Sequence, residues 1–236
     1  SAGFTTTNGT STVLGFSFSG AFIPSTTQEE IFVVLNYVSL DQNSLCIPSD
    51  NEEVVISGAA DSLSWLSKRL DMPAYFGANA GDLWGNAVLT SLPVEKVQNT
   101  HFNSKGRIPR GFQTLNLEAL GTSVTIINTH LDHEADGAPT RASQVVRILE
   151  SWNQGPRTLL VGDMNAEAGT AVVRTLDKAG FSDSNLDGPM TYPSGGPLER
   201  IDYIFSTADL MSAETLTGNS TASDHLLVWA RMRLAS

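Results

Sequence analysis

The residues most suited to chemistry stand where apolar runs begin or end. The run 158–161 leads into Gly162-Asp163-Met164-Asn165, so a buried strand there would present a carboxylate and an amide at its exit. Upstream, Ile126-Ile127-Asn128-Thr129-His130 follows the same pattern, and Ser223-Asp224-His225 directly precedes the last apolar run. Oxygen-rich groups suit a hard divalent metal ion and a phosphate. Three strand ends are therefore expected to bring polar side chains to one place.

A fourth string, Arg200-Ile201-Asp202-Tyr203, lies between the last two. The ordered set resembles the endonuclease/exonuclease/phosphatase superfamily, which has the DNase-I-like fold. That family shows a Thr-His-Leu strand end, Gly-Asp-x-Asn, an (Arg/Lys)-Ile-Asp-(Tyr/His) strand and a terminal Ser-Asp-His, in this order. One Gly-Asp-x-Asn string alone is a weak signal, because an ordinary strand-to-turn junction also fits it. The four motifs together, over about Leu83 to Leu234, predict the fold.

The resemblance implies a catalytic role for five residues. His225 would stabilise the charge that develops on phosphate oxygens or donate a proton, and Asp202 would hold its imidazole in one tautomer. His130 would be a second phosphate contact. Asp163 would orient or deprotonate the attacking water, and Asn165 would hydrogen-bond the phosphate.

Further residues are assigned to binding. Asp224 would assist metal binding. Asn86 belongs to a Gly-Asn-Ala-Val-Leu string that forms a strand near the rim of the site in the family, and it would either approach the substrate or serve a structural turn. Arg110, in Pro109-Arg110-Gly111, matches a family position near the site and could meet an anionic substrate. His101 and His133 lack matching companions and are expected in solvated loops.

The N-terminal half departs from the family pattern. Members begin with a strand ending in Asn, then a helix, then a strand ending in Leu-Gln-Glu, whose Glu is the principal metal ligand. Here 13–18 is expected to be the first strand, with Ser17 in place of the Asn, and 44–49 the second, with Ser49 in place of the Glu. A neutral hydroxyl is a poorer ligand than a carboxylate. Binding of Mg²⁺ or Mn²⁺ is therefore expected to be weak or lost, unless Asp50 or a neighbouring acid compensates.

Apolar spacing predicts the elements that would position these residues. Positions 31, 34, 35 and 38 repeat as on an amphipathic helix over 28–40. Further helices are expected after Asp61, from about Pro139, and over 170–179, and a hairpin is expected to turn at Gly121. The fold class is α+β: a four-layer α/β sandwich of two mixed β-sheets packed face to face with helices outside. Residues 1–12 are expected to be a flexible lead-in and 13–236 one domain.

Composition bears on the substrate. The 236 residues carry a net charge of −11, from 14 basic and 25 acidic side chains. A DNA or RNA binder needs a basic stripe, and only Lys105, Arg107 and Arg110 approximate one. Bulk nucleic acid is thus not the expected substrate, whereas a small phosphoester or a lipid headgroup fits better.

The expected location rests on the resemblance. No apolar stretch approaches the 18 residues of a membrane span. Two strings, 58–66 and 83–87, look like strings in members fused behind multi-pass membrane segments, including those similar to glycolipid-anchor remodelling proteins. The chain is therefore expected to be the extracytoplasmic domain of a longer protein.

Two classes of function remain open at this point. The first is a metal-dependent phosphoester hydrolase acting on a phosphodiester or a lipid-like phosphoester. The second is a catalytically impaired pseudoenzyme that binds a phosphorylated ligand, a lipid or a protein partner. Ser17 and Ser49 favour the second class. The complete set of Asp163, Asn165, Asp202, Asp224 and His225 favours the first.

Overall fold

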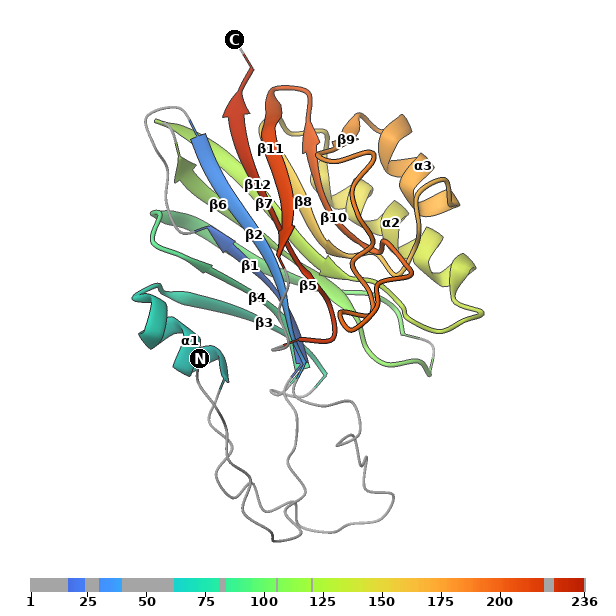
Figure 1. The fold of residues 1–236 in the computed structure, drawn as a ribbon. Coiled ribbons are helices and arrows are strands. Elements are labelled where there is room, and N and C mark those ends of the chain that lie inside the picture. Colours follow the sequence, from blue (N-terminus) through green and yellow to red (C-terminus); the bar gives the residue numbers. More distant parts are fainter. Residues whose placement is uncertain are drawn as a thin grey trace, which may run out of the picture.

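Two six-stranded β-sheets pack face to face in the computed structural model (Figure 1), which describes residues 17–23, 30–39, 62–80, 84–104, 106–119, 121–218 and 223–235. The first sheet has the strand order β11-β12-β2-β1-β4-β3. Its strands are β1 (Ser17–Ile23), β2 (Glu30–Ser39), β3 (Ala74–Ala80), β4 (Trp84–Thr90), β11 (Leu210–Gly218) and β12 (Leu227–Leu234). In this sheet β1 and β4 run parallel, and the other neighbours are antiparallel.

The second sheet has the order β5-β6-β7-β8-β10-β9. Its strands are β5 (Val94–His101), β6 (Gly111–Ala119), β7 (Thr122–His130), β8 (Thr158–Asp163), β9 (Phe181–Asp183) and β10 (Asp202–Thr207). Here β7 and β8 are the parallel pair, and the other neighbours are antiparallel. Both sheets are therefore mixed, as the sequence predicted.

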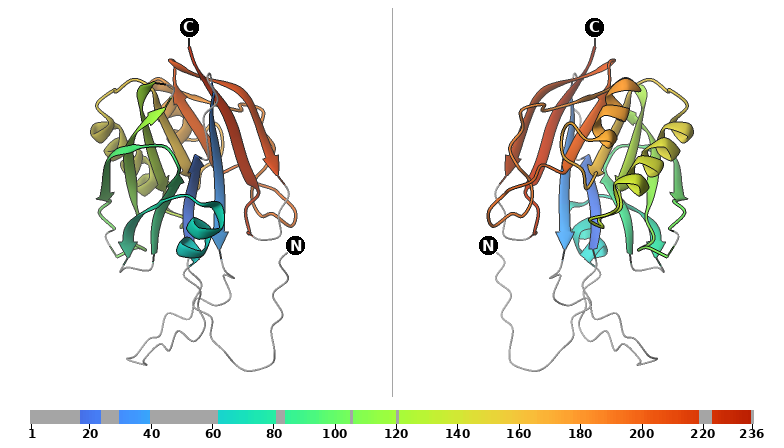
Figure 2. Two further views of the ribbon diagram at one scale, coloured as in Figure 1. Left: turned by 90° about the vertical axis from the view of Figure 1, so that its left-hand side faces the viewer. Right: turned by 90° about the vertical axis from the view of Figure 1, so that its right-hand side faces the viewer.

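Three helices occur among the described residues: α1 (Ser62–Leu70), α2 (Ala138–Trp152) and α3 (Ala171–Lys178). Figures 1 and 2 show α2 and α3 on the outer side of the second sheet, whereas α1 lies beside β3. The predicted helices near Pro139 and over 170–179 are confirmed, and Gly180 follows the end of α3 with a positive φ of 99°. The hairpin at Gly121 is confirmed as well. None of these helices is long and apolar enough to cross a membrane.

The helix predicted over 28–40 is wrong, because β2 occupies this segment. The segment Ile31-Phe32-Val33-Val34-Leu35 is rich in β-branched and aromatic residues, which favour extended backbone. It also lies between two strands, pairing with β1 on one side and β12 on the other. Strand pairing on both sides therefore decides against the helical periodicity.

The first strand is displaced from its predicted position. Ser17 was expected at the exit of a strand over 13–18, but it is the first residue of β1. It pairs with Ser39, the last residue of β2, and the next residue, Phe18, pairs with Gly85 at the start of β4. The backbone at Ser17 therefore lies at the sheet edge where β4 begins. Ser49, the second expected strand and the lead-in 1–12 lie outside the described residues. The helix expected after Asp61 is α1, which begins at Ser62.

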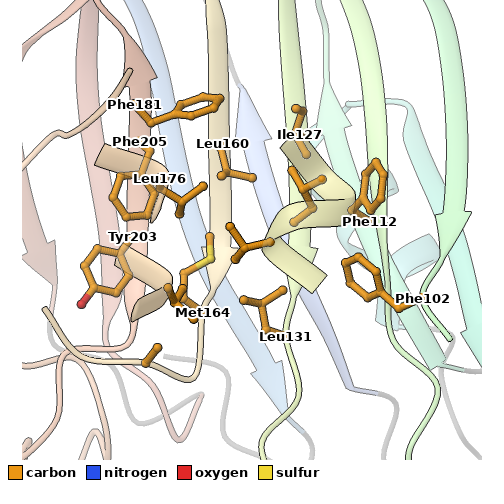
Figure 3. Packing of buried hydrophobic residues seen from close by; sticks show 14 residues of the cluster. Phe102, Phe112, Ile127, Leu131, Leu160, Met164, Leu176, Phe181, Tyr203 and Phe205 are labelled. Carbon is orange, nitrogen blue, oxygen red and sulfur yellow. The ribbon is translucent and has the colours of Figure 1, made fainter. Parts of the chain in front are cut away.

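Hydrophobic side chains form two layers around the second sheet. Between the sheets, β6, β7, β8, β10 and β12 contribute Leu115, Leu117, Val124, Ile126, Leu159, Val161, Ile204 and Val228. On the outer side, α2 and α3 cover a second cluster that includes Phe112, Ile127, Leu160, Tyr203 and Phe205 (Figure 3). All residues of β8 and β10 are buried, as expected for strands with both faces covered.

Gly162 connects this core to the end of β8. Its φ is 138°, and a Cβ there would overlap the carbonyl oxygen of Thr129 in the neighbouring strand. Only glycine allows β7 and β8 to approach this closely while the chain turns into residue 163.

We therefore expect Gly162→Ala to lower the free energy of unfolding by about 2–4 kcal/mol, through backbone strain and steric overlap. Urea unfolding monitored by tryptophan fluorescence would measure the change. Gly195→Ala is the matched control, because nothing lies within 4 Å of a Cβ at this position. Equal stability of the two variants would contradict this account of β8.

Candidate active site

Strand register places three polar residues side by side at the ends of neighbouring strands in the second sheet. In the parallel pair His130 of β7 lies opposite Asp163 of β8, and in the antiparallel pair Asp163 lies opposite Asp202 of β10. Side chains alternate along a strand, so these three share the face that Ile126, Val161 and Ile204 turn toward the other sheet. His130 Nε2 is 3.5 Å from Asp163 Oδ2.

The first sheet contributes His225, two residues before β12 begins. Its Nδ1 is 2.9 Å from Asp202 Oδ2, and both side chains are buried. The backbone N–H of His225 donates to the Ser223 hydroxyl, so the serine of Ser-Asp-His stabilises the turn that presents the imidazole. In Figure 1 both β10 and β12 point upward, away from this edge. The site thus lies at the lower ends of these strands in Figure 1, where the two sheets face each other.

Two carboxylates that face each other repel, and this repulsion contributes to the pKa of Asp163. Burial and the charge of Asp202 raise the pKa of Asp163 to about 7. Burial alone would lower the pKa of His225, but the hydrogen bond and charge of Asp202, with the charges of Asp163 and Asp224, raise it to about 9. At neutral pH His225 is therefore an imidazolium that partly neutralises the pair of acids.

His130 has the opposite electrostatic character. Burial, followed by the charges of His225 and His133, lowers its pKa well below the usual 6.5. Arg110 lies next to it, with Nη1 3.0 Å from His130 Nδ1 and its guanidinium over the Trp84 ring at 5.5 Å. Burial lowers the pKa of Arg110 to about 10, so it remains a cation at neutral pH. The site therefore holds one neutral and one charged histidine.

Asn165 acts on Asp163 within this structure. Its φ is 46°, in the left-handed region, and its backbone N–H donates to Asp163 Oδ1 at 2.6 Å. Its side-chain amide donates to the carbonyl of Leu131 at 3.1 Å, which ties the chain after β8 to the chain after β7. The predicted hydrogen bond from Asn165 to a phosphate stays a prediction.

Asn86 does not reach the surface. The side chain is fully buried in β4 and donates to the carbonyl of Gly111, next to Arg110, and to that of Asn128. A substrate contact is therefore not supported at this position, and neither is the alternative of a turn. Asn86 instead joins the two sheets behind the site.

Other predicted residues are placed as follows. Asp224 is half-buried beside His225, and its carbonyl accepts a hydrogen bond from the Ser194 N–H. His133 does lie in a loop, but its Nδ1 is 3.3 Å from Arg110 Nη2. His101 is the exposed last residue of β5 and not a loop residue, and its Nε2 is 2.7 Å from the carbonyl of Ala78.

Among the described residues, Asp163, Asp202 and His225 form a group that could hold a metal ion, with one potential ligand atom from each lying within 4.8 Å of the others. Carboxylate oxygens suit hard cations such as Mg²⁺ and Mn²⁺. The raised pKa of Asp163 shows that the site disfavours two negative charges, which a cation would offset. The two carboxylates therefore fit a divalent ion, whereas His225 could ligate one only after losing a proton. This donor set differs from the predicted ligands: Asp224 adjoins His225, and Ser49 lies outside the described residues.

The sequence matches the family described as Endonuclease/Exonuclease/phosphatase family over residues 38–225. The chain belongs to this family. The match covers most of the chain and spans all four motifs. Members of the family generally use divalent metal ions, and a buried cluster of acids and histidine is present here. No curated protein matches the sequence.

Solved structures share the fold of this family member. A functionally unknown conserved protein from Enterococcus faecalis V583 has 24% identity and a TM-score of 0.63, over 74% of this chain and 82% of that one. An endonuclease/exonuclease/phosphatase from Beutenbergia cavernae has 17% identity and a TM-score of 0.61, over 75% and 58%. The human Nocturnin catalytic domain with bound sulfate anion has 17% identity and a TM-score of 0.60, over 74% and 77%.

Sequence reasoning missed two aromatic residues at the site of this family member. The Tyr192 ring packs on the imidazole of His225, with ring centroids 4.7 Å apart. Trp84 lies under the Arg110 guanidinium. Neither residue belongs to one of the four motifs, and their contacts join strands and loops far apart in the chain. The available signal was weak: Tyr192 is an aromatic residue in an otherwise Gly-, Pro- and Ser-rich loop.

We expect Asp202→Asn to lower the pKa of His225 by at least about one unit, because the hydrogen-bonded charge that favours the imidazolium is removed. An NMR titration of the four histidines in metal-free buffer would measure it. Asp224→Asn is the matched control, since Asp224 acts on His225 more weakly than Asp202 does. A fall of the same size in both variants would show that Asp202 has no special role.

Proposed function

We propose that this domain is a metal-dependent phosphoester hydrolase that acts on a phosphodiester or a lipid-like phosphoester. The observation that carries the proposal is the buried group of Asp163, Asp202 and His225 at the edge where the two sheets meet, with His130 beside it. Membership of the endonuclease/exonuclease/phosphatase family supports the reaction class.

His225 is the group that meets developing negative charge. Its raised pKa keeps it protonated at neutral pH, so it can donate a hydrogen bond or a proton but cannot act as a base. Asp202 accepts from Nδ1, which leaves Nε2–H as the donor toward a phosphate oxygen or a leaving group. A fixed imidazolium needs no reorganisation when charge develops on the phosphoryl group.

Asp163 is the residue that would orient or deprotonate the attacking water. The backbone N–H of Asn165 fixes Oδ1, while Oδ2 faces His130. A carboxyl group with a pKa of about 7 changes its protonation close to neutral pH, which suits a group that orients or deprotonates a nucleophile. A bound Mg²⁺ or Mn²⁺ ion, held by the carboxylates of Asp163 and Asp202, would neutralise charge on the phosphate.

The charges around the site favour a small or lipid-like phosphoester over bulk DNA. Arg107 is engaged by Asp132 and Asp136, and Arg110 is buried against two histidines. These arginines therefore offer little free positive surface for a DNA backbone. The net charge of −11 adds long-range repulsion.

A catalytically impaired domain that binds a phosphorylated ligand, a lipid or a protein partner is the second candidate. It is favoured by the small number of carboxylates in the metal-binding group, which has two among the described residues. Mg²⁺ and Ca²⁺ sites usually need more oxygen ligands than these two side chains supply. Turnover measurements separate the two candidates.

With excess Mn²⁺ or Mg²⁺, the domain is expected to hydrolyse bis(p-nitrophenyl) phosphate. Asp163→Asn should reduce the rate by at least about 100-fold, since it removes the carboxylate that handles the water. Asp187→Asn makes the same chemical change at an exposed position and should retain the rate. Residual rates that are equal in wild type and Asp163→Asn would favour the pseudoenzyme.

Plasmid DNA is expected to be a poor substrate at physiological salt. At equal phosphodiester concentration, nicking should be at least about tenfold slower than hydrolysis of a phosphodiester lipid in mixed micelles, because the acidic surface opposes DNA association. A gel assay of plasmid and a phosphorus NMR assay of the micelles would compare the rates. Efficient nicking that disappears in Asp163→Asn would overturn the argument from charge.

A further inference from the structure

Arg110 lies beside the candidate site. It is 97% buried, at the residue directly before β6. Its carbonyl accepts the N–H of Phe102, and the adjacent Gly111 carbonyl accepts from Asn86 and Thr129. Burying a guanidinium is costly unless its donors find specific partners.

The partners that Arg110 finds are two imidazole nitrogens. Nη1 lies 3.0 Å from His130 Nδ1, and Nη2 lies 3.3 Å from His133 Nδ1. A guanidinium has only N–H donors and no acceptor. Both Nδ1 atoms must therefore accept, which is possible only if each imidazole is neutral and carries its proton on Nε2.

We propose that Arg110 is a positioning residue that fixes His130 and His133 as neutral imidazoles with the proton on Nε2. One guanidinium thereby sets both the orientation and the tautomer of two rings. The assignment rests on hydrogen-bond geometry. Its meaning for catalysis rests on the proposed phosphoester hydrolysis.

The fixed tautomer directs the Nε2–H group of His130 into the site. Its Nε2–H faces Asp163 Oδ2, 3.5 Å away, so Arg110, His130 and Asp163 form a continuous line into the site. A doubly protonated His130 would turn Nδ1–H toward the N–H of Arg110 and place two cations in contact. His130 therefore presents an N–H to the site without adding a positive charge.

This arrangement is the reverse of that at His225. Asp202 accepts from Nδ1 of His225 and so favours the imidazolium, whereas Arg110 donates to Nδ1 of His130 and favours the neutral ring. Asp163 lies between the two rings: His130 Nε2 is within 3.5 Å of it, and its charge helps to raise the pKa of His225. The side of the site at His225 thus supplies a cation and protons, and the side at His130 supplies a fixed neutral donor.

The tautomers can be observed directly because the chain has four histidines. In protein labelled with ¹⁵N-histidine, long-range ¹H–¹⁵N correlation spectra at pH 7.5 in metal-free buffer should show His130 and His133 with protonated Nε2 and unprotonated Nδ1. Signals are assigned from His130→Gln and His133→Gln. A protonated Nδ1 in His130 of the wild type overturns the proposal, whatever the variants do.

Arg110→Met removes the donors and keeps much of the aliphatic volume. His130 should then lose its fixed tautomer, so that its ¹⁵N shifts move toward a mixture of both forms, and Arg110→Lys should restore the shifts only in part. Arg107→Met is the matched control: this nearby arginine pairs with Asp132 and Asp136, and no histidine contact of it is present in the described structure. Unchanged His130 shifts in a folded Arg110→Met protein would overturn the proposal.

Activity separates this inference from the proposed function. If the domain turns over a phosphodiester, Arg110→Met should lower kcat by about 10- to 100-fold, the range typical when the hydrogen-bond partners that orient metal-ligating side chains are removed. Absence of turnover in the wild type with the expected tautomers would reject the hydrolase and leave the role of Arg110 standing. Full kcat in an Arg110→Met protein that has lost the tautomer would confirm the contact and reject its catalytic role.

Discussion

The site depends on one cross-strand pair, Asp163 opposite Asp202. Like charges at directly opposed positions of an antiparallel pair destabilise a sheet, and burial makes their repulsion stronger. The structure offsets this repulsion by giving each of the two acids a hydrogen-bond donor. The backbone N–H of Asn165 supports Asp163, and the imidazolium of His225 supports Asp202. The acids are tolerated because these partners are in place, and a divalent cation bound as proposed would offset the same repulsion.

The packing of the two sheets is therefore part of the chemistry. His225 belongs to the first sheet and both acids to the second, so the charge balance of the site exists only when the sandwich closes. Glycine at position 162 permits the close approach of β7 and β8 that brings His130 alongside Asp163. Asn86 provides a polar bridge between the sheets, through its buried hydrogen bond to Gly111. Strand register therefore positions His130, Asp163 and Asp202, whereas the turn that leads into β12 positions His225.

The motifs were predictable from sequence because each couples a residue type to a strand end. Asp163, Asp202 and His225 could be placed together, since strands that end or begin at one sheet edge share it. β2 was missed because apolar positions within 28–40 satisfy a helical period, although the β-branched and aromatic residues of 31–35 favour a strand. Pairing with β1 and β12 decides between the two patterns. Arg110 and His133 show the second limit: their contact crosses 23 residues of chain and leaves no local pattern. Hydrophobic periodicity predicts local structure, whereas contacts between residues far apart in the sequence depend on how the whole chain folds.

The two histidines show how similar residues acquire different functions from their neighbours. Both are buried and both lie near Asp163, yet the pKa of His225 is raised and that of His130 is lowered. The hydrogen bond and charge of Asp202 raise the pKa of His225 despite its burial, whereas burial, followed by the charges of His225 and His133, lowers the pKa of His130. A phosphoryl group entering between them would meet a cation on one side and a neutral donor on the other. In the proposed hydrolysis this asymmetry would give the attacking and leaving sides of the phosphoryl group distinct partners, because only the imidazolium of His225 can release a proton readily at neutral pH.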